Sequence, residues 1–364
     1  MAVRPPAGVA AGHERLLKEF DARKPAALAR AVSVVENRRA GFEQLLAALH
    51  PRVGRARRIG ITGPPGAGKS TLATGLAAHW RAAGLTVGIV AVDPTSPFTG
   101  GALLGDRIRM ESVALDPGIF IRSMATRGSL GGLAATTREV ADVLDAFGFD
   151  RIVIETVGVG QSELEIAHTA DTSVVVLVPE SGDSIQTLKA GLMEIADVFV
   201  VNKADRPGAD RLRHELELML GLRGGKVFRN IPAHHGVDLK AIANPAKAAR
   251  DAAAASEAQN WTPPVLPTTA QTGDGVDALS DALGRHFDYL ERSGRLRVRR
   301  RQRLREQVVE VVERDVRRRL WSDRATSEWL DAQLAAIESG ESTPFEIAAE
   351  LLRRSANLLT RADG

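Results

Sequence analysis

The chain contains no cysteine and few aromatic residues, and both deficits limit its chemistry. Its 364 residues include no Cys and one Tyr, and aromatic side chains make up 4%. Without cysteine there is no disulfide, thiolate zinc site, iron–sulfur cluster or cysteine nucleophile. The first residues show no secretory signal pattern, and no apolar run approaches the roughly 20 residues that span a bilayer. We therefore expect a cytoplasmic protein with no membrane partner.

Positively and negatively charged side chains are nearly equal in number. The 48 Lys and Arg residues face 45 Asp and Glu residues, for a formal net charge of +3. Much of the excess lies in the arginine-dense stretch 292–307, which could contact nucleic acid. No aromatic residue interleaves with these arginines, so the stacking platforms expected of single-strand binding are absent. A solvated helical face is the simpler interpretation, and nucleic acid is not the partner we expect.

Short apolar runs alternate with helix-length segments through the middle of the chain. The runs are rich in β-branched residues and end at Gly, Asp, Glu or Pro. Continuous apolar strands that alternate with helices are typical of a parallel sheet covered by helices on both faces. The sequence therefore predicts an α/β fold. The expected strands are RRIGITG, LTVGIVAVD, FDRIVIE, TSVVVLVPE and DVFVVNKAD, with the short VLPTT further on.

A phosphate-binding loop follows the first of these strands. Residues 63–70, GPPGAGKS, match the pattern GxxxxGK[ST] between a strand and a helix. The glycines let backbone N–H groups turn toward phosphate oxygens, and the helix N-terminus adds a partial positive charge. Lys69 can reach the β- and γ-phosphates, and the Ser70 hydroxyl can ligate Mg²⁺. The predicted contacts of this loop are Gly63, Pro64, Pro65, Gly66, Ala67, Gly68, Lys69, Ser70 and Thr71.

A second motif selects the base. NKAD, residues 202–205, ends an apolar strand and carries Asn202, Lys203 and Asp205, and its asparagine and aspartate can hydrogen-bond a purine edge. A carboxylate here needs two donors, which guanine offers at its N1–H and exocyclic amine and adenine does not. The loop after VLPTT would place Thr269, Ala270 and Gln271 beside the base. The predicted nucleotide is therefore GTP, with GDP as its product.

Three acids compete for the roles of binding metal and positioning water. Asp93 and Glu155 each end an apolar strand, and Asp106 lies in a glycine-rich loop. Phosphoryl transfer needs charge neutralisation and an aligned water, so these acids and Ser70 are the candidate Mg²⁺ ligands. Gly158 can approach the γ-phosphate through its backbone. A turn cap before Pro94 remains an alternative for Asp93, and an ordinary loop position remains one for Asp106.

Residues 180–191 form a further loop, rich in glycine and serine. It carries Gln186 and Lys189, whose polar groups could reach the nucleotide. A surface loop that runs into a helix is the alternative.

Helical patterns flank the nucleotide-binding region, so we expect three parts. These are an N-terminal helical extension over 1–56, a P-loop GTPase domain over 57–290 and a C-terminal helical arm over 291–364. Residues 221–261 include an alanine-rich stretch without a clear period, which we interpret as an insertion. The arm carries an apolar stripe suited to dimerisation, formed by Leu304, Val308, Val311, Val312 and Val316.

Taken together, several of these segments resemble a known family. GPPGAGKST, VDPTSPFTGGALLGDRIRM, SMATRGSLGGLA, IETVGVGQSE and NKAD are similar to the motifs of the MeaB/ArgK/MMAA GTPases, which belong to the SIMIBI class of P-loop proteins. The likeness is dense over residues 20–205 and loose elsewhere. The spacing from NKAD to TTAQ is longer than is usual in that family. Relatives have also been called transport-system kinases, a name that assumes an adenine nucleotide. The NKAD motif favours guanine instead.

The resemblance implies a function. It implies slow Mg²⁺-dependent GTP hydrolysis, a homodimer formed through helical extensions, and binding to an adenosylcobalamin-dependent acyl-CoA mutase, usually methylmalonyl-CoA mutase. The family gates cofactor delivery to that mutase and protects or reactivates it. By position, Asp93, Asp106 and Glu155 match the family's active-site acids, and Gln186 and Lys189 match a mobile switch. A metal-insertion GTPase for urease or hydrogenase and a GTP-switched nucleic-acid-binding protein remain the alternatives.

Overall fold

The computed structural model describes residues 11–94, 110, 113–126, 132–156, 166–180, 192–223 and 261–356. The chain divides into two compact units, Met1–Arg299 and Arg300–Gly364. Most of the expected insertion, residues 224–260, lies outside the described part. The domain boundaries expected at 56 and 290 remain predictions.

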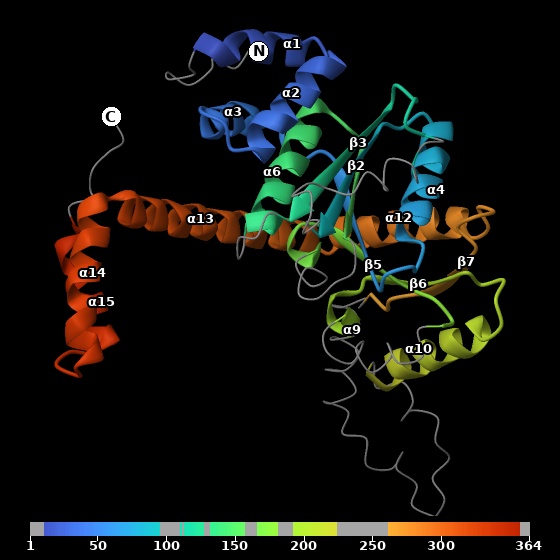
Figure 1. Ribbon diagram of the computed structural model, residues 1–364. Coiled ribbons are helices and arrows are strands. Elements are labelled where there is room, and N and C mark those ends of the chain that lie inside the picture. Colours follow the sequence, from blue (N-terminus) through green and yellow to red (C-terminus); the bar gives the residue numbers. More distant parts are fainter. Residues whose placement is uncertain are drawn as a thin grey trace, which may run out of the picture. The chain divides into compact units, whose positions relative to one another are not determined.

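A seven-stranded sheet forms the centre of the first unit (Figure 1). Its strand order is β3-β2-β4-β1-β5-β6-β7, and every pairing among the described strands is parallel. This topology confirms the α/β fold expected from the alternating pattern. The strands are β1 (Arg57–Thr62), β2 (Val87–Pro94), β3 (Ile119–Thr126), β4 (Arg151–Thr156), β5 (Thr172–Leu177), β6 (Val198–Asn202) and β7 (Val265–Thr268).

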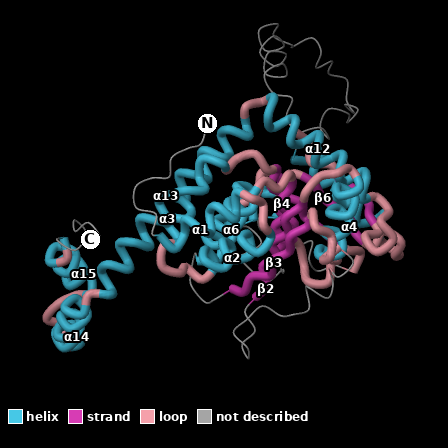
Figure 2. Tube along the Cα trace, turned by 90° about the horizontal axis from the view of Figure 1, so that it is seen from above, coloured by secondary structure: helices cyan, strands magenta, loops and turns pink. Residues whose placement is uncertain are grey.

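Helices cover both faces of this sheet, which explains why its strands are apolar on both sides. One face packs against α4 (Lys69–Ala82) and α12 (Val276–Arg292). The other face packs against α6 (Gly132–Phe147) over β2 and β4, and against α9 (Leu192–Ile195) and α10 (Ala209–Arg223) over β5 and β6. Figure 2 shows the strands between α6 and α4. A short 3₁₀ turn, η2 (Ile166–His168), precedes β5.

The sequence does not predict β3, which is an edge strand. Several of its side chains are only partly buried, and Arg122 donates to Glu36 at 2.8 Å from Nε. An edge strand has a partner on one side only and tolerates polar residues, so its pattern is weaker than that of a central strand.

The N-terminal helices pack over α6 as an additional layer. They are α1 (Ala11–Asp21), α2 (Pro25–Glu36) and α3 (Phe42–Leu49), followed by the 3₁₀ turn η1 (His50–Arg52). Apolar side chains at helical spacing hold the layer in place, as the sequence predicts. The buried ones include Leu28, Val32, Val35 and Leu45.

A buried ionic network anchors α6 to the start of β1. The Arg58 guanidinium donates to Asp142 at 2.7 Å and to Asp145 at 3.0 Å. The Asp145 carboxylate also accepts from the backbone N–H groups of residues 54–56. Burial alone would lower the pKa of Arg58, but the negative charges of Asp142, Asp145 and Asp171 raise it. Arg58 therefore stays charged and fixes where the chain enters the sheet.

The C-terminal part is helical, as expected. It comprises α13 (Arg295–Ser322), α14 (Arg324–Glu338) and α15 (Pro344–Arg354). Asp323 caps α14 by accepting from Thr326 N, and Thr343 begins a capping box at α15. Both caps satisfy N–H groups that the first turn of a helix leaves without partners. No helix in the described part of the chain has the length and apolar character that crossing a membrane requires.

A second network centres on the buried carboxylate of Asp197, just before β6. Its carboxylate accepts from Arg299 at 2.8 and 2.9 Å and from Ser173 N at 2.9 Å, and His286 Nε2 lies 3.2 Å away. Trp261 Nε1 donates to the Asp197 carbonyl at 2.7 Å. Burial would raise the pKa of Asp197, but the hydrogen bonds and charges of His286 and Arg299 lower it to about 2. These contacts attach α12 and the start of α13 to the amino edge of the sheet.

We predict that Asp197→Asn lowers the free energy of unfolding at pH 7 by roughly 2 kcal/mol, because the variant loses a carboxylate whose folded-state pKa lies below its ordinary value of 3.8. That stability is present above about pH 4 and is lost as the pH falls toward 2. Urea unfolding at several pH values measures it. The difference from wild type should shrink between pH 4 and pH 2, whereas Asp281→Asn, an exposed change on α12, should have little effect. A pH-independent difference would contradict this assignment.

Candidate nucleotide-binding site

The carboxyl ends of β1, β4 and β2 bring the predicted residues to one edge of the sheet. Glu155 of β4 pairs in register with Ile61 of β1 on one side and with Ala91 of β2 on the other. Asp93 lies two residues beyond Ala91, opposite Ala125 of β3. Because parallel strands end at the same edge, the loop that follows β1 opens beside both acidic positions. The structure places the backbone of Asp93 here, and its side chain lies outside the description.

The loop from residue 63 to 68 turns sharply between β1 and α4. Gly63 has φ +140°, and a Cβ at this position would lie 2.0 Å from the carbonyl oxygen of Val176, so only glycine fits. Lys69 is 5% exposed, and its Nζ donates to the carbonyl oxygens of Gly63 and Pro64 at 2.8 and 2.9 Å. The ammonium group is thus held against the loop, where phosphate oxygens could replace these carbonyls as its acceptors. Three other predicted contacts, Pro65, Gly66 and Thr71, are exposed.

Ser70 and Glu155 meet at the first turn of α4. The Ser70 hydroxyl donates to Glu155 Oε1 at 2.6 Å, and both side chains are buried. Behind them, Thr156 Oγ1 donates to Thr62 Oγ1 at 3.1 Å and links β4 to β1. A hydroxyl and a carboxylate are the hard oxygen ligands that Mg²⁺ prefers, so this pair fits the ion. The described residues contain no group of three His, Asp or Glu side chains arranged for a metal. Phosphate and water oxygens usually supply further Mg²⁺ ligands, and the predicted ligand roles of Asp93 and Asp106 stay predictions.

Asn202 joins the phosphate loop to the predicted base loop. Its Nδ2 donates to the carbonyl oxygen of Ala67 at 2.7 Å. Its Oδ1 accepts from Thr268 Oγ1 at 3.1 Å and from Ala270 N at 3.0 Å. A Cβ at Gly68, which has φ +85°, would lie 2.3 Å from Asn202 Nδ2. The sequence predicts that Asn202 contacts the purine edge, but these three bonds of its buried amide go to the protein.

The remaining base-side residues lie around the ends of β6 and β7. Lys203 has φ +56°, and Ala204 N donates to the Thr268 carbonyl at 3.0 Å, so the turn after β6 is held by β7. Asp205 and Gln271 are exposed beside this turn. The structure therefore brings both base motifs to the same end of the sheet as the phosphate loop. Sequence reasoning missed Thr268, whose only signal is its position at the end of a short strand.

Four predicted residues fall outside the described part of the chain, so their roles stay predictions. They are Asp106, Gly158, Gln186 and Lys189.

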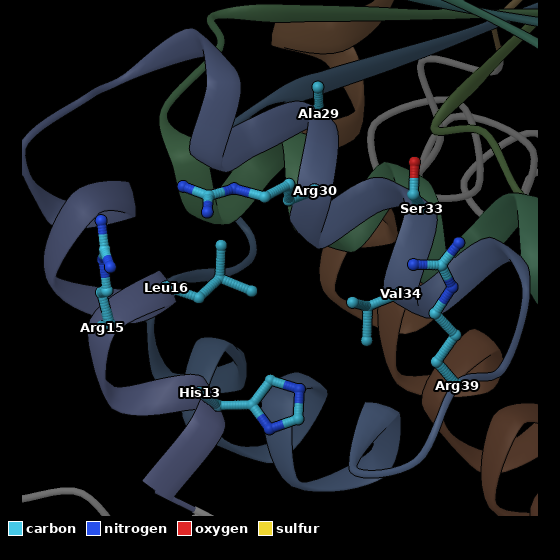
Figure 3. A pocket seen from close by; sticks show the side chains of 8 residues that line it. All are labelled: His13, Arg15, Leu16, Ala29, Arg30, Ser33, Val34 and Arg39. Carbon is cyan, nitrogen blue, oxygen red and sulfur yellow. The ribbon is translucent and has the colours of Figure 1, made fainter.

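The N-terminal helices hold a separate pocket of about 450 Å³ (Figure 3). His13 and Leu16 of α1 face Val34 of α2 across it. None of the predicted nucleotide contacts lines this pocket, so it is not the nucleotide site. Its lining is His13, Arg15, Leu16, Ala29, Arg30, Ser33, Val34 and Arg39.

The parallel sheet and the phosphate loop define a P-loop nucleotide hydrolase, and comparison with known proteins gives its family. The model of the family "Methylmalonyl Co-A mutase-associated GTPase MeaB" matches residues 28–325. The chain belongs to this family and is a GTPase that binds guanine nucleotides. The family expected from the sequence motifs is therefore confirmed.

Individual proteins agree with this assignment. A Pyrococcus horikoshii protein named as a GTPase is 44% identical over 338 residues, 93% of this chain and 96% of that protein. The mouse methylmalonic aciduria type A homolog, a mitochondrial protein, is 30% identical over 296 residues, 81% of this chain and 65% of that protein. A crystal structure described as a LAO/AO transport system kinase has a TM-score of 0.64 and 26% identity, and the match covers 98% of this chain and 100% of that one.

We predict that Asn202→Ala weakens GTP binding at least tenfold, because it leaves the Ala67 carbonyl and the Ala270 N–H without their partner and lets the two loops separate. Thr268→Val removes one of the three bonds while keeping the side chain's shape, so its effect should be intermediate. Calorimetric titration with Mg-GTP measures both. Wild-type affinity in Asn202→Ala would show that the loops keep their places without this amide.

Proposed function

We propose that this GTPase is a chaperone of an adenosylcobalamin-dependent acyl-CoA mutase, with methylmalonyl-CoA mutase as the first candidate. In this role it gates delivery of the cofactor and protects or reactivates the mutase. The observation that carries the proposal is the family match over residues 28–325, since that family is described by its association with methylmalonyl-CoA mutase. The similarity to the mouse methylmalonic aciduria type A homolog supports the same class of partner.

The proposed hydrolysis uses the residues at the carboxyl edge of the sheet. Backbone N–H groups of the phosphate loop and Lys69 neutralise charge on the β- and γ-phosphates. Ser70 and Glu155 hold Mg²⁺, together with Asp93 and Asp106. The ion, when bound, adds charge neutralisation at the phosphate oxygens. The contact between Ser70 and Glu155 keeps both ligands in place before GTP arrives, so less ordering is needed on binding.

The proposed signal to the mutase follows from nucleotide state. GTP and GDP can change mutase binding only if the two states contact the mutase with different free energy. Loops ordered by the γ-phosphate and Mg²⁺ supply such a difference. In this scheme Gln186 and Lys189 belong to a switch that follows the nucleotide through the partner. In this scheme the nucleotide binds at one edge of the sheet, and the loops at that edge change their contacts with the mutase.

We further propose a homodimer formed through the C-terminal helices. Along α13, Val298, Leu304, Val308 and Val312 are between 49% and 67% exposed, an apolar surface that a second copy of the chain would cover. Size-exclusion light scattering tests this, and a monomer at high protein concentration would contradict it.

We predict that affinity for methylmalonyl-CoA mutase differs at least tenfold between the complexes with Mg-GDP and with a Mg-bound, non-hydrolysable GTP analogue. In the proposed scheme, the γ-phosphate that the analogue keeps and GDP lacks is the group that changes the contacts with the mutase. Biolayer interferometry on immobilised mutase measures both affinities. Lys69→Ala should lose the difference and GTP hydrolysis, and Lys18→Ala, a matched change on the surface of α1, should keep both. Equal mutase affinity in both nucleotide states of the wild type would contradict the proposed function.

A further inference from the structure

A small pocket lies at the amino edge of the sheet, the edge opposite the phosphate loop. It has a volume of about 190 Å³ and is enclosed by the starts of β1 and β4, the end of α4 and the middle of α12. β1 runs from Arg57 at this pocket to Thr62 at the phosphate loop, a length of roughly 17 Å at the usual rise per residue. The two sites are therefore separate. None of the nucleotide contacts predicted from the sequence lies in this pocket.

Two arginines from neighbouring strands line this pocket. Arg57 and Arg151 pair in register, so their side chains emerge on the same face of the sheet. The Arg57 guanidinium lies over the ring of Phe287, 4.1 Å from its centre, and that of Arg151 lies over Trp80 at 6.0 Å. Aromatic faces hold a guanidinium in position without neutralising its charge. Burial, and then the positive charge of Arg57, lower the pKa of Arg151, which indicates that the two charges act on each other.

The acidic groups near these arginines leave part of the charge unbalanced. Arg57 Nη2 lies 3.5 Å from Asp288 Oδ1, and the Asp288 side chain is 56% exposed, so water screens this ion pair. Asp150 is held by the backbone N–H and the hydroxyl of Thr86, each at 2.8 Å. Its charge raises the pKa of Arg151 in part, and Arg151 Nη1 donates to the Asp150 carbonyl at 3.1 Å. His79 and Ser280 add polar atoms to the lining, and Ser280 Oγ accepts from Trp80 Nε1 at 2.9 Å. The lining thus offers several donors to an anion.

Gly284 opens this pocket from the helix side. It lies in the interior of α12, where glycine destabilises a helix relative to alanine. A Cβ added at Gly284 would meet no atom within 4 Å, so packing does not require a glycine here. A glycine beside a charged pocket instead leaves room for a ligand to approach the helix backbone closely.

We propose that this pocket binds a small tetrahedral oxyanion, either free phosphate or the phosphate group of a small monoester, between Arg57 and Arg151. Its volume is below the roughly 300–1,000 Å³ of pockets for drug-sized ligands, so a nucleotide does not fit. Paired guanidinium groups bind phosphate oxygens through several directed N–H donors.

The test uses the full chain saturated with Mg²⁺ and a non-hydrolysable GTP analogue, so that the phosphate loop is filled. Calorimetric titration with inorganic phosphate, and separately with glycerol 3-phosphate, should show one further site per chain that weakens as salt rises. The probe that binds more tightly identifies free phosphate or a monoester as the ligand. No further site for either probe would overturn the proposal.

Two variants, each with a matched control, test the location. Arg151→Gln removes one charge, and Gly284→Leu fills the pocket without changing any charge. Each should weaken binding at least tenfold while the loaded GTP analogue stays bound. Arg55→Gln, an exposed change just before β1, and Ala278→Leu, an exposed change on α12, lie outside the pocket and should bind like wild type. Unchanged binding in folded Gly284→Leu would also overturn the proposal.

Discussion

The buried side-chain amide of Asn202 connects the parts of the nucleotide site that come from distant places in the sheet. The phosphate loop follows β1 and the base loop follows β7, and β5 and β6 lie between these two strands. Asn202 contacts Ala67 on one side and Ala270 on the other. One amide therefore sets the spacing between the groups predicted to bind phosphate and those predicted to contact the base. Gly68 is part of this constraint, because any larger residue would displace the amide.

The amino edge of the sheet carries stabilising ion pairs, and the carboxyl edge carries the predicted nucleotide site. At the amino edge, the buried side chains of Arg58 and Asp197 form ion pairs that fix α6, α12 and the start of α13. At the carboxyl edge, glycine-containing turns leave backbone groups available, and Lys69 is held by carbonyl oxygens that phosphate could replace.

The fold could largely be predicted from the sequence, because the central strands are continuous apolar runs that end at Gly, Asp, Glu or Pro. The edge strand β3 escaped prediction, since partial exposure weakens its pattern. The positions of Lys69, Ser70 and Glu155 followed from motif spacing, and the structure brings them together. The bridging role of Asn202 could not be predicted, because it depends on the distance between loops far apart in the sequence. The same holds for the contacts among Asp197, His286 and Arg299, which join three separate segments.

We expect this chain to distinguish guanine through Asp205, in the turn after β6, beside a base loop that Asn202 ties to the phosphate loop. Calorimetry of Mg-GTP against Mg-ATP tests it most directly, because both nucleotides present the same triphosphate and differ in the base. We expect GTP to bind at least a hundredfold more tightly, since adenine cannot offer Asp205 two donors. Equal affinity for the two nucleotides would contradict the account.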